Sequence, residues 1–546
     1  MAYKQFTQNL HTPQTPQSEP IPGTNQARNN AGGYSFQIDA WDRLHRFLIL
    51  GSEGGSYYAT ERALTAENAH NAIACIKADG QRVVRETTAL SDSGRAPKND
   101  PAIFTLALCA ALGDPLTRRA ALEALPQVCR TGTHLFQFAG YVQSMRGWGR
   151  GLRRGIADWY NGMEPRDLAY QVIKYRQREG WTHLDLLRLA HPTPNEDAHS
   201  AIYRWIAGRS SEKREPEAWA TALTPPDNEA LTRIWAFEKA QTAADLATIL
   251  QLIDDYDLPR EALPTEWLNQ AAVWERLLQK MPMTAMIRNL GVMSKVGLIA
   301  PLSDAESLIV KRLSDRNALR KARIHPIMLL SALRVYARGR GVRGSSEWTA
   351  SAPIIDALDE AFYMAFDNVE PTGKRFLIAL DVSGSMGVGE IAGVPGLTPR
   401  EASAALALVT ARTEAQYGVI AFQTGITPLN GFTSKLRLDS AIQTISGLPF
   451  GGTDCAQPML YALEHKITVD TFVVITDNET WAGGIHPSQA LVQYREQMGI
   501  PARLIVVGMT ATQFSIADPN DAGMLDVVGF DAAAPQIMAD FARGTL

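Results

Sequence analysis

Five oxygen-bearing side chains stand where predicted strands end, in the C-terminal third of the chain. Asp381 closes the apolar run RFLIALD and is followed by Ser383 and Ser385 in the order DxSxS. Thr453 lies in the glycine-rich sequence FGGTD, and Asp477 closes the run TFVVITD. Because the carboxyl ends of parallel strands meet at one edge of a sheet, we expect these side chains to converge there. A purely oxygen ligand set suits a hard cation such as Mg2+, which keeps part of its water shell.

Two other interpretations of these residues are open. A lone DxSxS sequence is common where a capping loop begins a helix, because Asp and Ser accept hydrogen bonds from free backbone amides. A two-metal nuclease or phosphatase needs several carboxylates around its ions. This set offers Asp381 and Asp477, with Glu479 as a neighbour outside the ligand set. The pattern favours binding over hydrolysis, so we expect a protein without catalytic residues.

Basic side chains recur in the first two-thirds of the chain. Arg146, Arg150, Arg153 and Arg154 follow one another at offsets of 4, 7 and 8 residues, which predicts a basic stripe along one helix. Two further basic groups follow in the chain. The last of them, the third group, repeats at similar spacing and consists of Lys311, Arg312, Arg316, Arg320, Lys321 and Arg323. For each group, the alternative is an ordinary solvated helix face paired with acidic neighbours.

The second basic group also contains aromatic rings. It consists of Lys174, Arg176, Arg178, Trp181, His183 and His191. Cations beside rings suit phosphate contacts next to stacking on unpaired bases. His191 precedes Pro192, so a role as an ordinary helix-terminal residue is open as well. Three such groups favour a phosphate-binding surface, although charge alone does not distinguish RNA from DNA.

Two kinds of segment must position these residues. From about 36 to 366, apolar residues recur at three- and four-residue spacing in segments of helical length, so this stretch is predicted to be all helix. Many helices with short connections indicate an α-solenoid, with a compact all-α bundle as the alternative. From Pro371 onward, Val- and Ile-rich runs alternate with amphipathic stretches, which predicts a doubly wound parallel α/β sheet.

Composition bounds the remaining possibilities. A chain of 546 residues exceeds one hydrophobic core, so several domains are expected, and no apolar run is long enough to span a membrane. The net charge is −4, but residues 371–546 hold 10 Lys and Arg against 16 Asp and Glu, leaving 43 against 41 upstream. Any nucleic-acid surface must therefore be a local patch. Residues 1–32, rich in Gln, Pro, Thr and Asn, are predicted to form a flexible tail.

The four cysteines show no CxxC pairing and lie in apolar surroundings at positions 75, 109, 129 and 455. Reduced, buried thiols in a cytoplasmic protein are the expected state.

The ordered set DxSxS, GGTD and a strand-terminal Asp resembles the metal-ion-dependent adhesion site of von Willebrand A domains. The resemblance implies that the serines bind the ion directly and that the aspartates act partly through water. It also implies an open coordination position for an acidic group from a protein partner.

Longer segments resemble the Ro autoantigen (TROVE-domain) family, including its bacterial members. They match in sequence and order from residue 33 onward, and include RLHRFLILGSEGGSYYA, VCRTGTHLFQF, KYRQREGWTHLDLLRLAHP, MPMTAMIRNLG, VEPTGKRFLIALDVSGSM and TDNETWAGGIHP. The resemblance implies a ring of HEAT-like helical repeats over 33–370 and a von Willebrand A domain over 371–546. Residues 1–32 show no match.

The family resemblance also implies a function. Ro proteins bind small noncoding Y RNAs outside the ring, take single-stranded 3′ ends of misfolded RNAs into its hole, and act with 3′-to-5′ exoribonucleases in RNA quality control. The family's RNA-contacting residues correspond to Lys174, Arg178 and His191. At position 176 this chain has Arg where many animal members have Lys. This difference keeps the positive charge but changes the geometry of phosphate binding. A protein-interaction scaffold and a metal-dependent hydrolase are the alternative functions.

Overall fold

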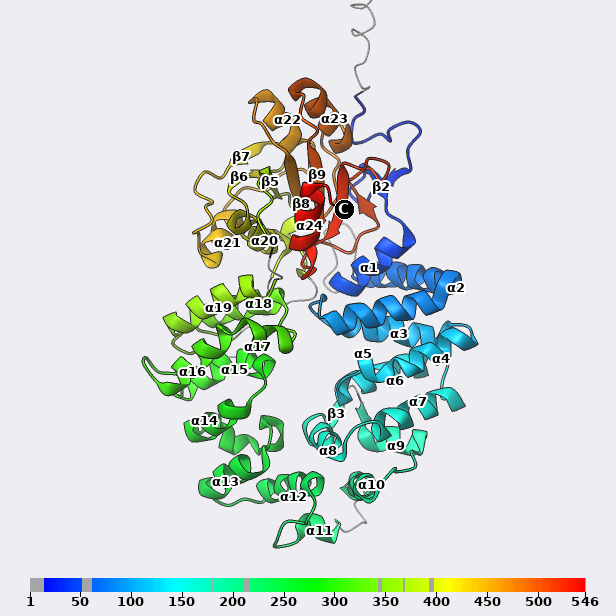
Figure 1. Ribbon diagram of the computed structural model, residues 1–546, viewed down its shortest axis with the longest axis vertical. Coiled ribbons are helices and arrows are strands. Elements are labelled where there is room, and N and C mark those ends of the chain that lie inside the picture. Colours follow the sequence, from blue (N-terminus) through cyan, green and yellow to red (C-terminus); the bar gives the residue numbers. More distant parts are fainter. Residues whose placement is uncertain are drawn as a thin grey trace, which may run out of the picture.

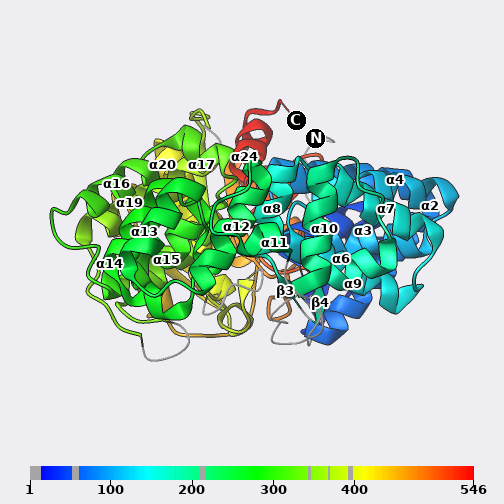
Figure 2. The same cartoon turned by 90° about the horizontal axis from the view of Figure 1, so that it is seen from below.

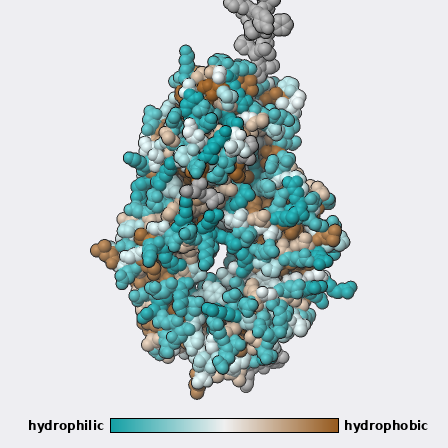
Figure 3. All heavy atoms as spheres, in the orientation of Figure 1, coloured by the Kyte–Doolittle hydropathy of each residue, from teal (hydrophilic) through white to brown (hydrophobic). Residues whose placement is uncertain are grey.

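The computed structural model describes residues 14–51, 61–178, 180–209, 217–341, 346–366, 369–391 and 397–545, with only the backbone described at 61–66 and 209. Its N-terminal two-thirds consist of helices that pack mainly against sequence neighbours, in two arms that descend from the C-terminal domain and meet at their far end (Figures 1 and 2). Figure 3 shows an opening between the arms. The predicted solenoid is therefore curved into a ring.

The helices of the ring have the following bounds: α1 Ala40–Leu50, α2 Glu61–Ser93, α3 Asp100–Leu112, α4 Pro115–Glu123, α5 Leu125–Val128, α6 Gly132–Met145, α7 Arg150–Asn161, α8 Pro165–Lys174, α9 His183–Ala190, α10 Asp197–Arg209, α11 Ala218–Thr221, α12 Glu229–Gln241, α13 Leu246–Tyr256, α14 Ala271–Lys280, α15 Met283–Lys295, α16 Asp304–Leu313, α17 Arg316–Lys321, α18 Pro326–Ala337 and α19 Ala352–Met364. Short 3-10 helices, η1 (Arg260–Ala262) and η2 (Thr265–Asn269), precede α14.

The all-helix prediction misses a two-stranded ribbon of β3 (Gln177–Arg178) and β4 (Trp181–Thr182). These strands are too short for an alternating pattern to be visible.

The C-terminal domain is a six-stranded sheet between helices. Its strands are β5 Arg375–Asp381, β6 Gln416–Phe422, β7 Ile426–Pro428, β8 Thr471–Thr476, β9 Arg503–Gly508 and β11 Met524–Val528, and the helices are α20 Pro399–Thr413, α21 Leu438–Ser446, α22 Gln457–Glu464, α23 Pro487–Met498 and α24 Ala534–Arg543. The order is β11-β9-β8-β5-β6-β7, and all pairs are parallel except the edge strand β7. Every residue of β8 is buried, as expected for a sheet covered on both faces.

The C-terminal domain contacts both arms of the ring. Arg46 of α1 donates to Asp526 of β11, and Arg334 of α18 forms a bidentate pair with Glu401 of α20, at 2.6 and 2.8 Å. The arms also meet directly, because the Arg323 guanidinium lies 2.6 Å from a carboxylate oxygen of Asp92 at the end of α2. The ring is thus closed by direct contact and by the sheet domain together.

The prediction of a flexible tail over 1–32 is wrong for residues 14–32; residues 1–13 lie outside the described part. Residues 14–37 lie against the C-terminal domain, where β1 (Gln26–Arg28) pairs with β2 (Tyr34–Gln37), and β2 pairs with β10 (Phe514–Ser515). The Gln17 side chain is completely buried and donates to Asp454 at 2.7 Å. Single long-range hydrogen bonds of this kind order a polar segment and leave no periodic pattern in its sequence.

A buried histidine lies where the two arms of the ring meet, and its protonation should weaken the fold. His325 has a nitrogen 3.0 Å from the Arg95 carbonyl, and its other ring nitrogen accepts from the Ile327 amide. Burial lowers the pKa of His325 to about 4. An unfolded histidine keeps its ordinary pKa, so the unfolded state binds more protons as the pH falls below that value, and stability is lost in this window.

The substitution His325→Asn keeps an oxygen that can cap the helix but removes the titrating ring. Between about pH 7 and about pH 5, we therefore expect the unfolding free energy of this variant to fall by about 2 kcal/mol less than that of the parent. Denaturant unfolding at each pH measures this difference. Parallel pH profiles for the two proteins would contradict a neutral, buried His325.

The four cysteines are buried free thiols, as the sequence predicts. Within the described residues, no helix combines the length and apolarity needed to cross a membrane.

Candidate metal centre and nucleic-acid interface

The five predicted ligand residues come together at one edge of the sheet. Asp381 ends β5, and Asp477 directly follows the neighbouring strand β8. The chain leaves these two strands toward opposite sides of the sheet, which makes this edge a topological switch point. Ser383 and Ser385 lie in the loop after β5, Thr453 lies in the loop before α22, and all five side chains are buried.

Local hydrogen bonds hold these side chains in place. The Ser383 amide donates to Asp381 Oδ1 at 2.8 Å, and the Thr476 hydroxyl donates to Asp381 Oδ2 at 2.6 Å. The Ser383 and Ser385 hydroxyls lie 3.1 Å apart. Within the described structure, the buried atoms Asp477 Oδ2 and Thr453 Oγ1 have no hydrogen-bond partner. Such orphaned oxygens are costly, and a bound cation would satisfy them, so the residues fit a metal ion.

The electrostatics of the site also call for a positive charge. Burial and the nearby Asp477 carboxylate raise the pKa of Asp381, and burial raises the pKa of Asp477. Burial and the Asp477 carboxylate also raise the pKa of Glu479. Arg400 also interacts with Asp381, but its guanidinium donates to the carbonyls of Ile445 and Leu448. A divalent ion would offset the repulsion between the buried carboxylates.

The first basic group does not lie on one helix, contrary to the prediction. Helix α6 ends at Met145, and Gly147 adopts a φ of +80° before α7 begins at Arg150. Arg146 therefore caps α6 and donates to the Ala111 carbonyl at 3.0 Å, while Arg150, Arg153 and Arg154 lie on α7. All four arginine side chains are exposed.

The second basic group lies on the ribbon and the helices around it. Lys174 ends α8, Arg176 lies two residues later and Arg178 lies on β3. His191 is the C-cap of α9 and has a left-handed backbone conformation. Arg176, Arg178 and His191 are exposed and Lys174 is half-buried. His183, by contrast, is a core residue, because it packs 4.8 Å from the Phe136 ring and bonds to the Tyr160 hydroxyl at 2.7 Å. It cannot stack on a base.

Two tryptophans join the first and second basic groups. The rings of Trp148, in the loop between α6 and α7, and Trp181, in β4, lie 5.9 Å apart. Both rings are half-buried. The contact therefore links the segment that leads into α7 with the ribbon that carries Arg178. We define the basic face as these two rings together with the exposed arginines of the first and second groups, Arg146, Arg150, Arg153, Arg154, Arg176 and Arg178.

Comparison with known proteins agrees with this architecture. The TROVE domain model matches residues 27–374, and the Ro60 vWA domain model matches residues 375–542. The chain is 43% identical to the RNA-binding protein RO60 of Deinococcus radiodurans, with 98% of each chain covered. This chain belongs to the Ro60 family. The predicted family resemblance is thereby confirmed.

Other Ro60 proteins support the same assignment. The RNA-binding protein RO60 of Caenorhabditis elegans is 39% identical, over 95% of this chain and 90% of that protein. The crystal structure of the Deinococcus radiodurans RO (RSR) protein superposes with a TM-score of 0.69 at 44% identity, covering 93% of this chain and all of the other. The predicted fold, a helical TROVE ring with a doubly wound von Willebrand A domain, is confirmed.

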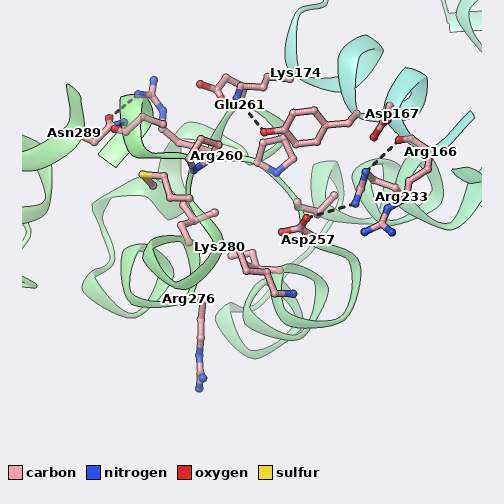
Figure 4. A pocket seen from close by; sticks show the side chains of 18 of the residues that line it. Arg166, Asp167, Lys174, Arg233, Asp257, Arg260, Glu261, Arg276, Lys280 and Asn289 are labelled. Carbon is pink, nitrogen blue, oxygen red and sulfur yellow. Dashed lines mark hydrogen bonds and ion pairs between the residues drawn. The ribbon is translucent and has the colours of Figure 1, made fainter. Parts of the chain in front are cut away.

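In this Ro60-family chain, Lys174 also borders a groove of about 670 Å³ between α8, α12, α13 and α14 (Figure 4). Its ammonium donates to the Tyr170 hydroxyl at 2.9 Å, and the Arg233 guanidinium lies 5.5 Å from the centre of that tyrosine ring. Burial lowers the pKa of Lys174, but the Tyr170 hydrogen bond and nearby tyrosines outweigh it, so the net pKa is raised and the lysine stays charged. His191 borders a separate cavity beside Tyr203.

The third basic group serves the ring itself. Arg312 donates to the carbonyls of Leu278 and Met281 near the end of α14, and Arg323 pairs with Asp92. Helix α16 ends before α17 begins, so the group is not one continuous stripe. Arg320 is exposed on α17. The alternative interpretation, an exposed cation paired with an acidic neighbour, therefore describes Arg323, whereas Arg312 is bonded to backbone carbonyls.

Sequence reasoning missed the residues that support the metal loop of this Ro60 protein. Asn30 donates to a Glu479 carboxylate oxygen at 2.7 Å, and the Ala31 amide donates to the other at 3.2 Å. Asn29 donates to the Thr480 carbonyl at 2.7 Å. The N-terminal segment thus fixes the loop that follows Asp477. The one available signal was the segment TDNETWAGG, which matches the family and places Glu479 and Thr480 just after the predicted metal ligand Asp477.

Proposed function

We propose that this protein binds RNA through the basic face, since its Ro60 relatives are named RNA-binding proteins. The observation that carries the proposal is the contact of Trp148 with Trp181, which unites two exposed basic groups beside aromatic rings. Cations beside rings hold phosphates and stack unpaired bases together. The proposed RNA contacts are the six arginines of the basic face together with Lys174 and His191, which border cavities near it in the chain. From the third group, Arg320 on α17 is proposed as a separate RNA contact, and Arg323 is assigned to ring closure.

The finer proposal is that Y RNAs bind outside the ring and that single-stranded 3′ ends of misfolded RNAs enter the opening. The opening between the arms supports this proposal (Figure 3). We propose that it admits a single strand and excludes a folded RNA. Selection would depend on shape and charge more than on base sequence, and binding would weaken steeply with salt. The partners proposed for this role in RNA quality control are 3′-to-5′ exoribonucleases in the cytoplasm.

We further propose that Asp381, Ser383, Ser385, Thr453 and Asp477 hold a divalent cation, and that this cation is Mg2+. The orphaned Asp477 Oδ2 and Thr453 Oγ1 support this assignment. When bound, the ion would supply a positive charge that accepts an acidic group of a protein partner. The proposed ligand set contains two carboxylates, Asp381 and Asp477, whereas a two-metal hydrolase needs several around its ions, so we propose binding and not hydrolysis.

Fluorescence anisotropy of a labelled stem–loop RNA with a single-stranded 3′ tail tests RNA binding. We expect saturable binding whose log affinity falls linearly with log salt. Binding that is absent, or unaffected by salt, would contradict the basic face.

The hydrolase alternative is tested with the same RNA and Mg2+. We expect intact RNA on a denaturing gel after prolonged incubation. Cleavage that disappears in Asp381→Ala would reverse the assignment of this protein as a non-enzyme.

A further inference from the structure

Exposed apolar side chains surround the metal centre. In the described part of the C-terminal domain, three large apolar side chains are strongly exposed: Val388 at 45%, Phe450 at 60% and Trp481 at 41%. Val388 lies three residues after Ser385, Phe450 lies three before Thr453, and Trp481 lies four after Asp477. Each of the three loops that carry predicted ligands therefore presents one of them. We call these three residues the apolar rim.

The two rings of the apolar rim are held in place by the ligand loops. A Cβ placed on Gly387 would lie 2.7 Å from Cε1 of Phe450, so that ring packs directly against backbone. The buried Arg400 guanidinium lies 4.4 Å from the centre of the same ring. A Cβ on Gly452 would lie 3.0 Å from Cζ2 of Trp481, and the Trp481 amide donates to the Thr453 carbonyl. Rings fixed before binding lose little entropy when a partner covers them.

The loops that carry the predicted ligands offer no cations to an anionic polymer. The segments 383–391, 450–454 and 477–484 contain no Lys or Arg. Their acidic residues outside the ligand set do not form an exposed cluster, because Asp454 and Glu479 are buried and hydrogen-bonded and Glu390 is half-buried. RNA needs cations for successive phosphates, and these loops would supply none beside a single ion. One carboxylate from a partner is compatible with this site, because the ion accepts it, while further acidic groups would find no cation to pair with.

We infer that the apolar rim and the metal centre together form a docking site for a protein segment that carries one Asp or Glu flanked by apolar side chains. The carboxylate occupies the ion's open position, and the flanking side chains cover Phe450 and Trp481. This inference rests on the proposed metal site and gives its partner a specific chemistry: apolar neighbours are required, and acidic runs are rejected.

A positional-scanning peptide array tests the inference. The peptides carry a central Glu, Gln or Lys, with apolar, polar or acidic residues on both sides, and the full chain is applied in excess MgCl2 and again in EDTA. Phe450→Ser and Trp481→Ser are compared with Leu223→Ser, which removes an equally apolar side chain, 94% exposed, from the helical part. Thermal unfolding and Mg2+ titration of each variant confirm that fold and metal binding are retained.

We expect Mg2+-dependent binding of peptides with a central Glu and apolar neighbours, weakened about tenfold by either rim substitution and unchanged in Leu223→Ser. Equal binding of Glu and Gln peptides, of apolar and acidic neighbours, or to parent and rim variants would overturn the inference. So would displacement of the peptide by single-stranded RNA, which would make RNA the ligand of the rim. A parent protein that fails to bind Mg2+ would instead refute the underlying metal site.

Discussion

Replacing Ser383 and Ser385 together with alanine is expected to abolish Mg2+ binding without unfolding the protein. The two hydroxyls lie 3.1 Å apart at the edge where Asp381 and Asp477 meet, and a hard ion has few other oxygens there to replace them. The fold should survive, because Asp381 retains the Thr476 hydroxyl and the backbone amide of residue 383.

Calorimetric titration and thermal unfolding with and without MgCl2 measure this effect. Mg2+ should raise the unfolding temperature of the parent, because it binds the folded state, and should leave that of the double variant unchanged. Thr444→Ala, which removes an exposed hydroxyl from α21, serves as the matched control. Unchanged Mg2+ affinity in the double variant would mean that the ion lies elsewhere.

Neutralising Lys174, Arg178 and His191 together should weaken RNA binding about a hundredfold at low salt and lower the slope of log affinity against log salt by about 2. Lys174 and Arg178 lie on either side of the turn into the ribbon, and His191 ends the next helix. Removing two permanent charges removes two phosphate contacts, and the change in slope separates this loss from a general change in structure.

Anisotropy titrations at several salt concentrations check the expected slope. The control replaces Lys374, Lys435 and His465, which are exposed on the C-terminal domain, with the same neutral residues. Its affinity and salt slope should match those of the parent. Retained affinity in the first triple variant would reject the assignment of these three residues.

The convergence of the five predicted ligand residues was predictable because its signal is local. Asp381 and Asp477 each close an apolar strand, and parallel strands deliver their ends to one edge, so sequence position alone determines the neighbourhood. The order of the strands was not needed. For the same reason the von Willebrand A domain was recognisable, apart from its antiparallel edge strand β7.

The basic groups were predicted less well, because their roles depend on contacts between distant segments. Helical spacing suggested one stripe through Arg146 and Arg150, but Gly147 takes a positive φ and divides it. Arg323 is exposed, as its position in the sequence suggests, but the closure of the ring places Asp92 beside it. His183 begins a helix in the sequence, and its burial arises from Phe136 and Tyr160 on other helices.

The N-terminal segment was predicted wrongly for a related reason. Gln17, Asn29 and Asn30 make individual hydrogen bonds to residues more than 400 positions away, and such bonds require no apolar period. A polar composition therefore does not distinguish a disordered tail from a segment ordered by a partner surface.

We propose that the basic face and the opening in the ring select RNA with a free single strand. This selection is tested by comparing the affinity of the full chain for one RNA duplex with and without a single-stranded 3′ tail, over a range of salt. We predict that the tailed duplex binds at least about tenfold more tightly at moderate salt, with the larger salt dependence. Equal affinity for the tailed and blunt duplexes would show that the protein does not select a free strand.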